Sequence, residues 1–329
     1  MVQLATSMGA TFPVWSALRS AVVVLVVVAG CHSAIAPTEQ YRAAPPNTPS
    51  PVVAVLGDQQ RTGTMEVWRE RNTIHGDLVQ QLARTQPQAL VVLGDQVFRG
   101  DDNDDWAFFD RIMEPVRKAS IPVFPMLGNH EYFGNNSRMR EHVRARFPGM
   151  NHRYYTVVID SVAYIMLDTN FDEYDADSAV YQLRWFKTMV RRYDGADSVR
   201  CIVVCGHHPP HTNSRTVPPE KILLRYFVPV AERSRKARLW LSGHCHAYER
   251  FLVNNITFVV SGGGGGPRQL LREHTDPRAE PDLYNGGTIR PFHFLTLRRQ
   301  GAAIRGTMIP LRGSNAPADE WVTRDVRTE

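Results

Sequence analysis

The chain has 329 residues, of which 43% are hydrophobic and 22% are charged, as in an ordinary globular protein and unlike a disordered or fibrous one. Its formal net charge of +5 slightly favours acidic or phosphorylated partners. The arginines are scattered in small groups along the chain, so the sequence predicts no nucleic-acid groove.

The first thirty residues are typical of a targeting segment. Arg19 precedes the apolar stretch 21–29, which is shorter than the ~20 residues needed to span a bilayer and has the length of a signal-peptide core. Small residues lie directly before Cys31, as at a bacterial lipoprotein processing site. We therefore predict a lipoprotein signal peptide over residues 1–30 and lipidation of Cys31, with an ordinary secretory signal as the alternative. The anchor would hold the protein to a membrane of the bacterial cell envelope, facing outside the cytoplasm.

Composition predicts the remaining boundaries. Residues 31–50 are rich in Ala, Pro, Thr and Ser without apolar periodicity, which indicates a flexible tether. We predict one folded domain over residues 51–311 and a tail over 312–329. Apart from Cys31, the chain has Cys201, Cys205 and Cys245. Buried free thiols are favoured over a disulfide between Cys205 and Cys245.

Five short apolar runs each end in a glycine or in Ser-Gly, followed by side chains able to bind a metal ion. Such runs indicate buried strands, and ligands of open α/β sheets collect beyond the carboxyl ends of strands. We therefore expect one polar crevice that binds metal. The runs cover residues 52–56, 89–93, 121–127, 201–205 and 239–242.

Helical and further strand patterns lie between and after these runs. Apolar residues at helical spacing predict helices over 74–82, 109–116 and 183–190. β-rich segments predict a hairpin, a further strand and a final antiparallel pair. The fold class that we predict is α/β, a four-layer α-β-β-α sandwich with two mixed sheets packed together and helices outside. The β-rich segments are 154–159 with 163–167, then 256–260, and 292–297 with 302–309.

The side chains at the strand ends point to a pair of metal ions. Asp, Asn and His supply mixed oxygen and nitrogen ligands, which suit Mn, Zn or Fe better than a structural thiolate site does. These candidate ligands are more numerous than one ion can bind, so we expect two ions that share one carboxylate. The ordered set consists of Gly57-Asp58-Gln59-Gln60, Gly94-Asp95, Gly128-Asn129-His130-Glu131, Gly206-His207 and Gly243-His244-Cys245-His246. This set resembles the calcineurin-like metallophosphoesterase superfamily, and within it the purple acid phosphatases.

The resemblance implies a role for each matching residue. Two divalent or trivalent ions (Mn, Fe, Zn or Mg) would bind, and hydroxide held by them would attack the phosphorus of a small phosphorylated substrate in line. His130 would orient the phosphate or protonate the leaving oxygen. The ligands would be Asp58 and His246 for the first metal, Asp95 as the bridge, and Asn129, His207 and His244 for the second metal. Candidate substrate contacts are Arg99, His208, His211 and Tyr248.

Two positions depart from the purple acid phosphatase pattern. Phe98 lies where those enzymes have a metal-binding tyrosine, so no iron–tyrosinate centre can form. Gln60 lies where many superfamily members have a histidine, and we predict its carbonyl as a fourth ligand to the first metal. Because Phe98 cannot orient His130, Glu131 and Asp168 are the candidates for that role.

The resemblance favours an acid phosphatase-like phosphomonoesterase. A phosphodiesterase or nucleotide pyrophosphatase is the alternative within enzymes, and a non-catalytic cell-surface binding lipoprotein is the alternative outside them. The glycine run 262–266 lacks the Gly-Lys-Ser/Thr of a phosphate loop, so we interpret it as the exit from a strand. The long segment 262–290 is a candidate lid over the crevice.

Overall fold

The computed structural model describes residues 40–41, 52–62, 74–311 and 318–324. The predicted signal peptide and Cys31 lie outside the described residues, as does most of the tether. Among the described residues, no helix is both long enough and apolar enough to cross a membrane.

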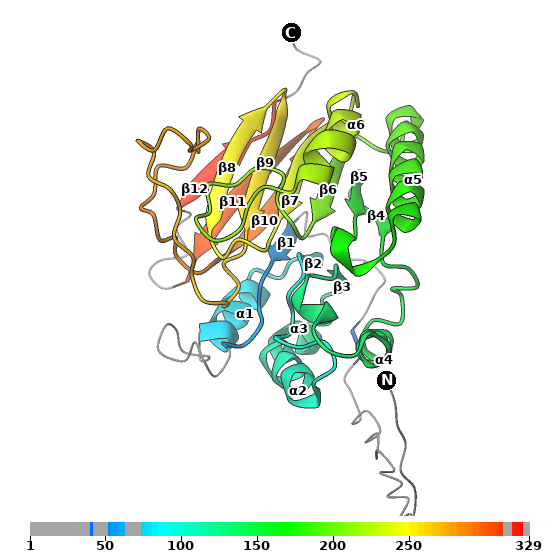
Figure 1. Cartoon of the computed structure of the whole chain (residues 1–329), viewed down its shortest axis with the longest axis vertical. Coiled ribbons are helices and arrows are strands. Elements are labelled where there is room, and N and C mark those ends of the chain that lie inside the picture. Colours follow the sequence, from blue (N-terminus) through cyan, green and yellow to red (C-terminus); the bar gives the residue numbers. More distant parts are fainter. Residues whose placement is uncertain (1–39, 42–51, 63–73, 312–317, 325–329) are drawn as a thin grey trace, which may run out of the picture. The chain divides into compact units, whose positions relative to one another are not determined.

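Within the described residues, one six-stranded mixed sheet has the order β12-β11-β10-β1-β2-β3 (Figure 1). The first three strands of the chain run parallel to one another, and β10 joins β1 in antiparallel fashion, followed by β11 and β12. The strands are β1 Val52–Leu56, β2 Ala89–Val92, β3 Val123–Pro125, β10 His293–Gln300, β11 Ala303–Pro310 and β12 Asp319–Val322.

The second six-stranded sheet has the order β4-β5-β6-β7-β9-β8. Its four central strands are parallel, and its two edge strands are antiparallel to their neighbours. The predicted hairpin of 154–159 with 163–167 is therefore present as β4 and β5. The strands are β4 Tyr155–Ile159, β5 Val162–Met166, β6 Cys201–Gly206, β7 Ala237–Ser242, β8 Tyr248–Val253 and β9 Ile256–Ser261.

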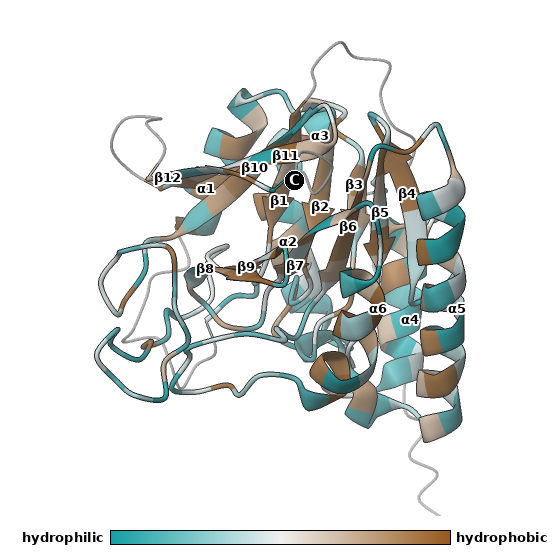
Figure 2. Cartoon of the chain, turned by 90° about the horizontal axis from the view of Figure 1, so that it is seen from above, coloured by the Kyte–Doolittle hydropathy of each residue, from teal (hydrophilic) through white to brown (hydrophobic). Residues whose placement is uncertain are grey.

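Helices cover the outer face of each sheet, so the predicted fold is confirmed. A first group packs on the first sheet, and α5 with α6 packs on the second (Figure 1). Figure 2 shows strands that are mainly hydrophobic and an α5 that mixes both kinds of residue. The helices are α1 Ile74–Arg84, α2 Asn103–Ile112, α3 Glu114–Lys118, α4 Asn136–Arg146, α5 Ala176–Gly195 and α6 Val228–Glu232. Short 3₁₀ turns cover His130–Tyr132 and Phe171–Glu173, and a π-helical turn covers Leu223–Phe227.

Strand alternation explains the layers. In β1, Ala54 and Leu56 belong to the core beneath the helices, whereas Val53 and Val55 belong to the core between the sheets. Successive side chains of a strand point to opposite faces, so a strand buried on both faces reads as one apolar run. The polar turns that follow the central strands meet in one region.

Three predicted boundaries need correction. The helix predicted over 109–116 is two helices, because α2 ends at Ile112 and α3 begins at Glu114 with Pro115 in its first turn. The domain does not end at residue 311, since β12 pairs with β11 within the predicted tail. Tyr41 of the predicted tether is 3% exposed and donates a hydrogen bond to Asp110 Oδ1 at 3.1 Å, so the chain packs on the domain there.

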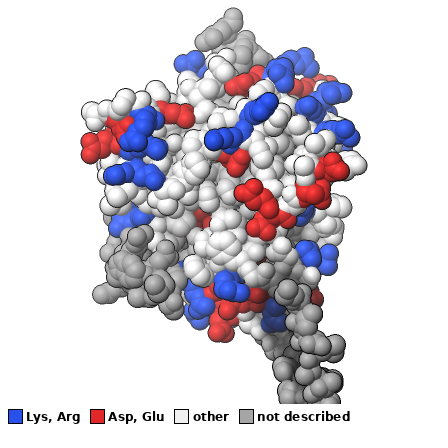
Figure 3. Space-filling model, in the orientation of Figure 1, with Lys and Arg blue, Asp and Glu red and all other residues white. Residues whose placement is uncertain are grey.

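Two further features concern charge and thiols. On the face of the molecule in Figure 3, acidic and basic side chains lie interspersed.

The cysteines of the described residues, Cys201, Cys205 and Cys245, are all buried and free, as predicted.

Candidate metal centre

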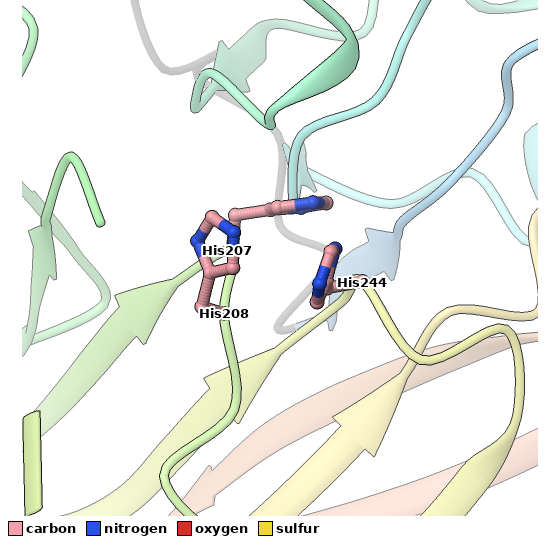
Figure 4. Close-up of side chains that lie close together, drawn as sticks. All are labelled: His207, His208 and His244. Atoms are coloured by element: carbon pink, nitrogen blue, oxygen red, sulfur yellow. The ribbon is translucent and has the colours of Figure 1, made fainter. Parts of the chain in front are cut away.

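The turns after the central strands bring two groups of possible metal ligands together. One oxygen or nitrogen atom from each of Asp58, Asp95 and His246 lies within 4.8 Å of the other two. The same holds for His207, His208 and His244, which project from the ends of β6 and β7 (Figure 4). Residues from nearly two hundred positions of sequence thus converge at the carboxyl ends of strands, as predicted for an α/β sheet.

Three of the predicted ligands have an unusual backbone. Asp58, Asp95 and His244 have φ values of 62°, 53° and 66°, in the left-handed region that non-glycine residues rarely occupy. Such a conformation costs about 1 to 3 kcal/mol and persists only where neighbours impose it. Here the His244 amide donates to Asp58 Oδ1 at 2.8 Å, so the two strained turns hold each other. Strain of this kind is typical of ligand clamps.

Two glycines of the sequence blocks are required by close approach. Gly94 has a φ of 92°, and a Cβ atom there would lie 2.6 Å from His207 Nδ1. A Cβ atom on Gly128 would overlap the Asp95 carboxylate. Any larger residue would push the turns apart, which explains why glycine precedes the polar side chains.

Hydrogen bonds orient two histidines toward the centre. His207 Nδ1 lies 2.8 Å from the Leu93 carbonyl, and His246 Nδ1 lies 2.8 Å from the Pro267 carbonyl. A carbonyl can only accept, so each Nδ1 carries a proton, and each ring presents the Nε2 lone pair once that nitrogen is deprotonated. His207 Nε2 lies 3.4 Å from Asp95 Oδ2, and His246 Nε2 lies 3.5 Å from Asp58 Oδ1. A backbone carbonyl behind the ring is the usual support of a metal-binding histidine.

Gln60 completes a group of facing acceptors. In the orientation that satisfies its neighbours, its amide nitrogen donates to the backbone carbonyls of Asp58 and Asp95, at 3.2 Å each. Its oxygen then accepts from His246 Nε2 at 3.0 Å when that nitrogen carries a proton. With the proton on His246 Nδ1 instead, the oxygen and Nε2 are two acceptors, which a cation between them would join. The donor set therefore fits a cation held by oxygen and nitrogen ligands.

The electrostatics of the two carboxylates differ. Burial raises the pKa of Asp58 well above its usual value. Burial alone would also raise the pKa of Asp95, but His207, His130 and His244 together outweigh it and hold that pKa below its usual range. Asp95 in turn raises the pKa of His207 to about 9 against the effect of burial. A cation bound there would replace the proton on His207, so metal binding should release protons.

His130 is oriented by the backbone and not by either predicted carboxylate. Its Nδ1 lies 2.9 Å from the Phe98 carbonyl. Glu131 is fully buried and instead accepts the amides of Asp95, Gln96, Val97 and Gly128 at 2.6 to 3.2 Å. Asp168 accepts from the Tyr132 hydroxyl at 2.8 Å and pairs with Arg153 at 3.2 Å. Glu131 and Asp168 therefore do not orient His130 as predicted. Both carboxylates instead support the surrounding turns.

Of the predicted substrate contacts, only His208 lies among the candidate ligands. Its Nδ1 lies 2.9 Å from Thr169 Oγ1, and its ring lies 4.4 Å from that of His244. Burial lowers the pKa of His208 to about 3, so the ring is neutral.

The other three predicted contacts, Arg99, His211 and Tyr248, bond to other residues in this structure. Arg99 pairs with Asp101 at 3.1 Å on the surface. His211 Nδ1 lies 2.7 Å from Glu280 Oε2, which joins two loops. Tyr248 is fully buried and donates to Asp319 Oδ2 of β12 at 2.8 Å. Its side chain faces the core between the sheets, because β8 turns that face inward.

A cavity of about 200 Å³ opens onto the candidate ligands. The sequence analysis did not identify three of the residues that line it. They are Val217 from the loop 207–222, and Pro267 and Gln269 from the loop 262–292. The glycine run was a usable signal, since a Cβ atom on Gly266 would lie 2.8 Å from His246 Cε1. The lining residues are Gln60, Asp95, Phe98, Asn129, His130, Val217, His244, His246, Pro267 and Gln269.

The candidate lid 262–290 is bonded to its surroundings. Drawn in orange, it lies beside β8 and β12 in Figure 1. Asn213 Nδ2 donates to the Glu280 carbonyl at 2.9 Å, and the Arg250 amide donates to Asp282 at 3.0 Å. Arg290 and Asp282 form a buried ion pair at 2.6 Å. These contacts fix the segment to the rest of the domain. Its residues Pro267 and Gln269 line the cavity.

Comparisons with known proteins agree with this geometry. The family described as calcineurin-like phosphoesterase matches residues 52–248. No curated protein sequence shows significant similarity to the chain.

Three solved structures share the fold at low sequence identity. The GAP50 anchor in the inner membrane complex of Plasmodium is 16% identical, with a TM-score of 0.62 and coverage of 83% of this chain and 88% of that one. A purple acid phosphatase from yellow lupin seeds is 15% identical, with a TM-score of 0.63 and coverage of 84% and 54%. A dimetal phosphatase from Danio rerio is 14% identical, with a TM-score of 0.56 and coverage of 84% and 99%.

Proposed function

The chain belongs to the calcineurin-like phosphoesterases, hydrolases of phosphate esters, and we propose that it acts as a phosphomonoesterase with two metal ions. The observation that carries the proposal is the convergence of two groups of ligand atoms on neighbouring points, with Asp95 between them. We assign the first ion to Asp58, Gln60, Asp95 and His246, and the second to Asp95, Asn129, His207 and His244.

The metal ions would supply charge. Bound in such a pair, divalent ions polarise the phosphoryl oxygens and lower the pKa of water to about 7. The protein's own part is to hold the ligands in place before binding, through the carbonyls behind His207 and His246.

His130 has the geometry of a proton donor to the leaving oxygen. Its Nδ1–H donates to the Phe98 carbonyl, which leaves Nε2 to take up and release a proton. Its backbone amide donates to Asp95 Oδ1 at 3.0 Å, so the turn that carries His130 is tied to the bridging carboxylate. We therefore assign His130 as the general acid that protonates the departing alkoxide.

The size of the cavity supports monoesters. At about 200 Å³ it is below the range of roughly 300 to 1,000 Å³ that is typical of drug-sized ligands. Val217 and Pro267 limit the room above the ligands. Comparing an aryl phosphate with its bis-aryl diester tests this preference, and faster hydrolysis of the diester would favour the phosphodiesterase alternative.

Asp95→Asn tests the assignment as an enzyme. Loss of a supporting residue outside the ligand set already costs about 10- to 100-fold in metal affinity or activity, so loss of the bridging ligand should lower kcat/KM by at least about 100-fold. The measurements are bound metal per chain and hydrolysis of an aryl phosphate with Mn, Mg, Zn or Fe. Asp172→Asn, at an exposed position, is the matched control. Unchanged metal content and activity in Asp95→Asn would favour a non-catalytic binding protein.

We further propose that lipidated Cys31 holds the enzyme in the bacterial cell envelope. The support is the sequence alone, in which a short apolar core and small residues precede Cys31. Metabolic labelling with a fatty acid tests it. The full chain should incorporate label and Cys31→Ser should not, whereas equal labelling of the two would contradict the proposal.

A further inference from the structure

Outside the candidate ligands, the cavity is lined partly by apolar side chains and by no lysine or arginine among the described residues. The apolar residues are Phe98, Val217 and Pro267. Phosphate groups in protein sites are commonly met by Arg or Lys, and a buried charge without a partner is costly. A second phosphate on the substrate would therefore meet no lysine or arginine among the described residues that line the cavity. The geometry favours a substrate whose only charge is the reacting phosphate.

Two phenylalanines flank the proposed proton donor. The ring centroid of His130 lies 5.1 Å from that of Phe98 and 4.6 Å from that of Phe133. Phe98 lines the cavity, and Phe133 is 42% exposed directly after the turn that carries His130. The organic part of a substrate must lie beside His130 if this residue protonates the leaving oxygen. Phe98 therefore offers aromatic surface inside the cavity, and Phe133 offers exposed aromatic surface beside His130, outside the residues that line the cavity.

From these two observations we infer that Phe98 and Phe133 form an aromatic wall that selects phosphate monoesters of neutral aromatic alcohols. The inference rests on the proposed function. Offset or edge-to-face contacts between rings contribute beyond the burial of apolar area, and aliphatic groups of the same size lack them. The wall thus favours an aromatic ring over a saturated one.

A matched pair of substrates isolates this effect. Benzyl phosphate and cyclohexylmethyl phosphate both release a primary alcohol of similar size, so the chemistry at phosphorus is closely similar. The ratio of their kcat/KM values should be roughly two- to tenfold in favour of the benzyl ester. In Phe133→Leu the ratio should fall toward 1, because only the Phe98 part of the wall remains. Tyr226→Leu, which removes a ring that is 45% exposed elsewhere, should keep the wild-type ratio.

Binding provides a second readout. Benzylphosphonate and cyclohexylmethylphosphonate are not hydrolysed, and calorimetry with the metal-loaded protein should show the same preference and the same loss in Phe133→Leu. A carboxylate on the ring, as in 4-carboxybenzyl phosphate, should lower kcat/KM because the wall offers no cation. Circular dichroism checks that each variant is folded.

The outcomes separate the inference from the proposed function. If the metal-loaded protein hydrolyses none of the monoesters, the proposed function is wrong. If it hydrolyses both members of the pair equally, or if Phe133→Leu keeps the preference for the benzyl ester, the aromatic wall is wrong while the function stands.

Discussion

Glu131 offers a strong test of how the centre is held together. Its carboxylate lies fully buried beneath the cavity and accepts four backbone amides. Oε1 takes the amides of Gln96 and Val97, and Oε2 takes those of Asp95 and Gly128. The residue thereby joins the turn of the bridging ligand to the turn of Asn129 and His130. We expect Glu131→Gln to loosen both turns.

The size of the effect follows from the hydrogen bonds. Glutamine keeps one oxygen, which can serve one pair of amides, and it turns an NH₂ group toward the other pair. Burial raises the pKa of Glu131 to about 7, so the carboxylate is charged above that pH. A hydrogen bond to a charged group contributes about 1.5 to 3 kcal/mol, so above pH 7 losing two should lower the free energy of unfolding by about 3 to 6 kcal/mol. Because the Asp95 turn is loosened, metal affinity should also fall by about 10- to 100-fold.

Urea unfolding of the metal-free protein, followed by circular dichroism, measures the stability term. Metal titration of the folded protein measures the affinity. Glu141→Gln on α4 is the matched control, since Glu141 is exposed and its replacement should change the free energy of unfolding by less than about 0.5 kcal/mol. A loss below about 1 kcal/mol in Glu131→Gln would refute the reasoning.

Two further predictions concern residues outside the cavity. Tyr248→Phe removes the hydroxyl that donates to Asp319 and accepts from Trp321, so the free energy of unfolding should fall by about 2 kcal/mol. Its kcat/KM should stay within about twofold of wild type, and a tenfold drop would restore Tyr248 as a substrate contact. Burial lowers the pKa of His293 from 6.5 to about 4, so below pH 6.5 the unfolded chain takes up a proton that the folded protein does not. The contribution of His293 to the free energy of unfolding is thus present above pH 6.5 and should fall by about 2 to 3 kcal/mol between pH 7 and pH 4.5. In urea unfolding, His293→Gln should lack this decrease.

The layered fold could be predicted because each of its signals is local. A strand that is buried on both faces must be apolar at every position, as in β1 and β6. The predicted end of the domain at residue 311 was wrong because it depends on contacts between residues far apart in the sequence. β12 is short and amphipathic, so only its pairing with β11 distinguishes it from a tail.

The ligand set could be predicted for a related reason. Asp58, Asp95 and His244 each lie within three residues of the end of a strand, so the strand carries the side chain to the shared edge of the sheets. What supports them could not be read from the sequence. The partner of His130 is a backbone carbonyl, and backbone carbonyls leave no mark on the residue type that carries them.

The sequence by itself determined the central strands, where their polar turns fall and which family the turns belong to, because these properties depend on residues adjacent in the chain. It did not reveal the edge strands β8 and β12. Only the tertiary structure decided that Tyr248 and His211 hold the frame, and that Phe133 and Val217 lie near the centre. Alternation along a strand tells that a side chain faces one side, but which partner lies there depends on how the two sheets and the two long loops pack.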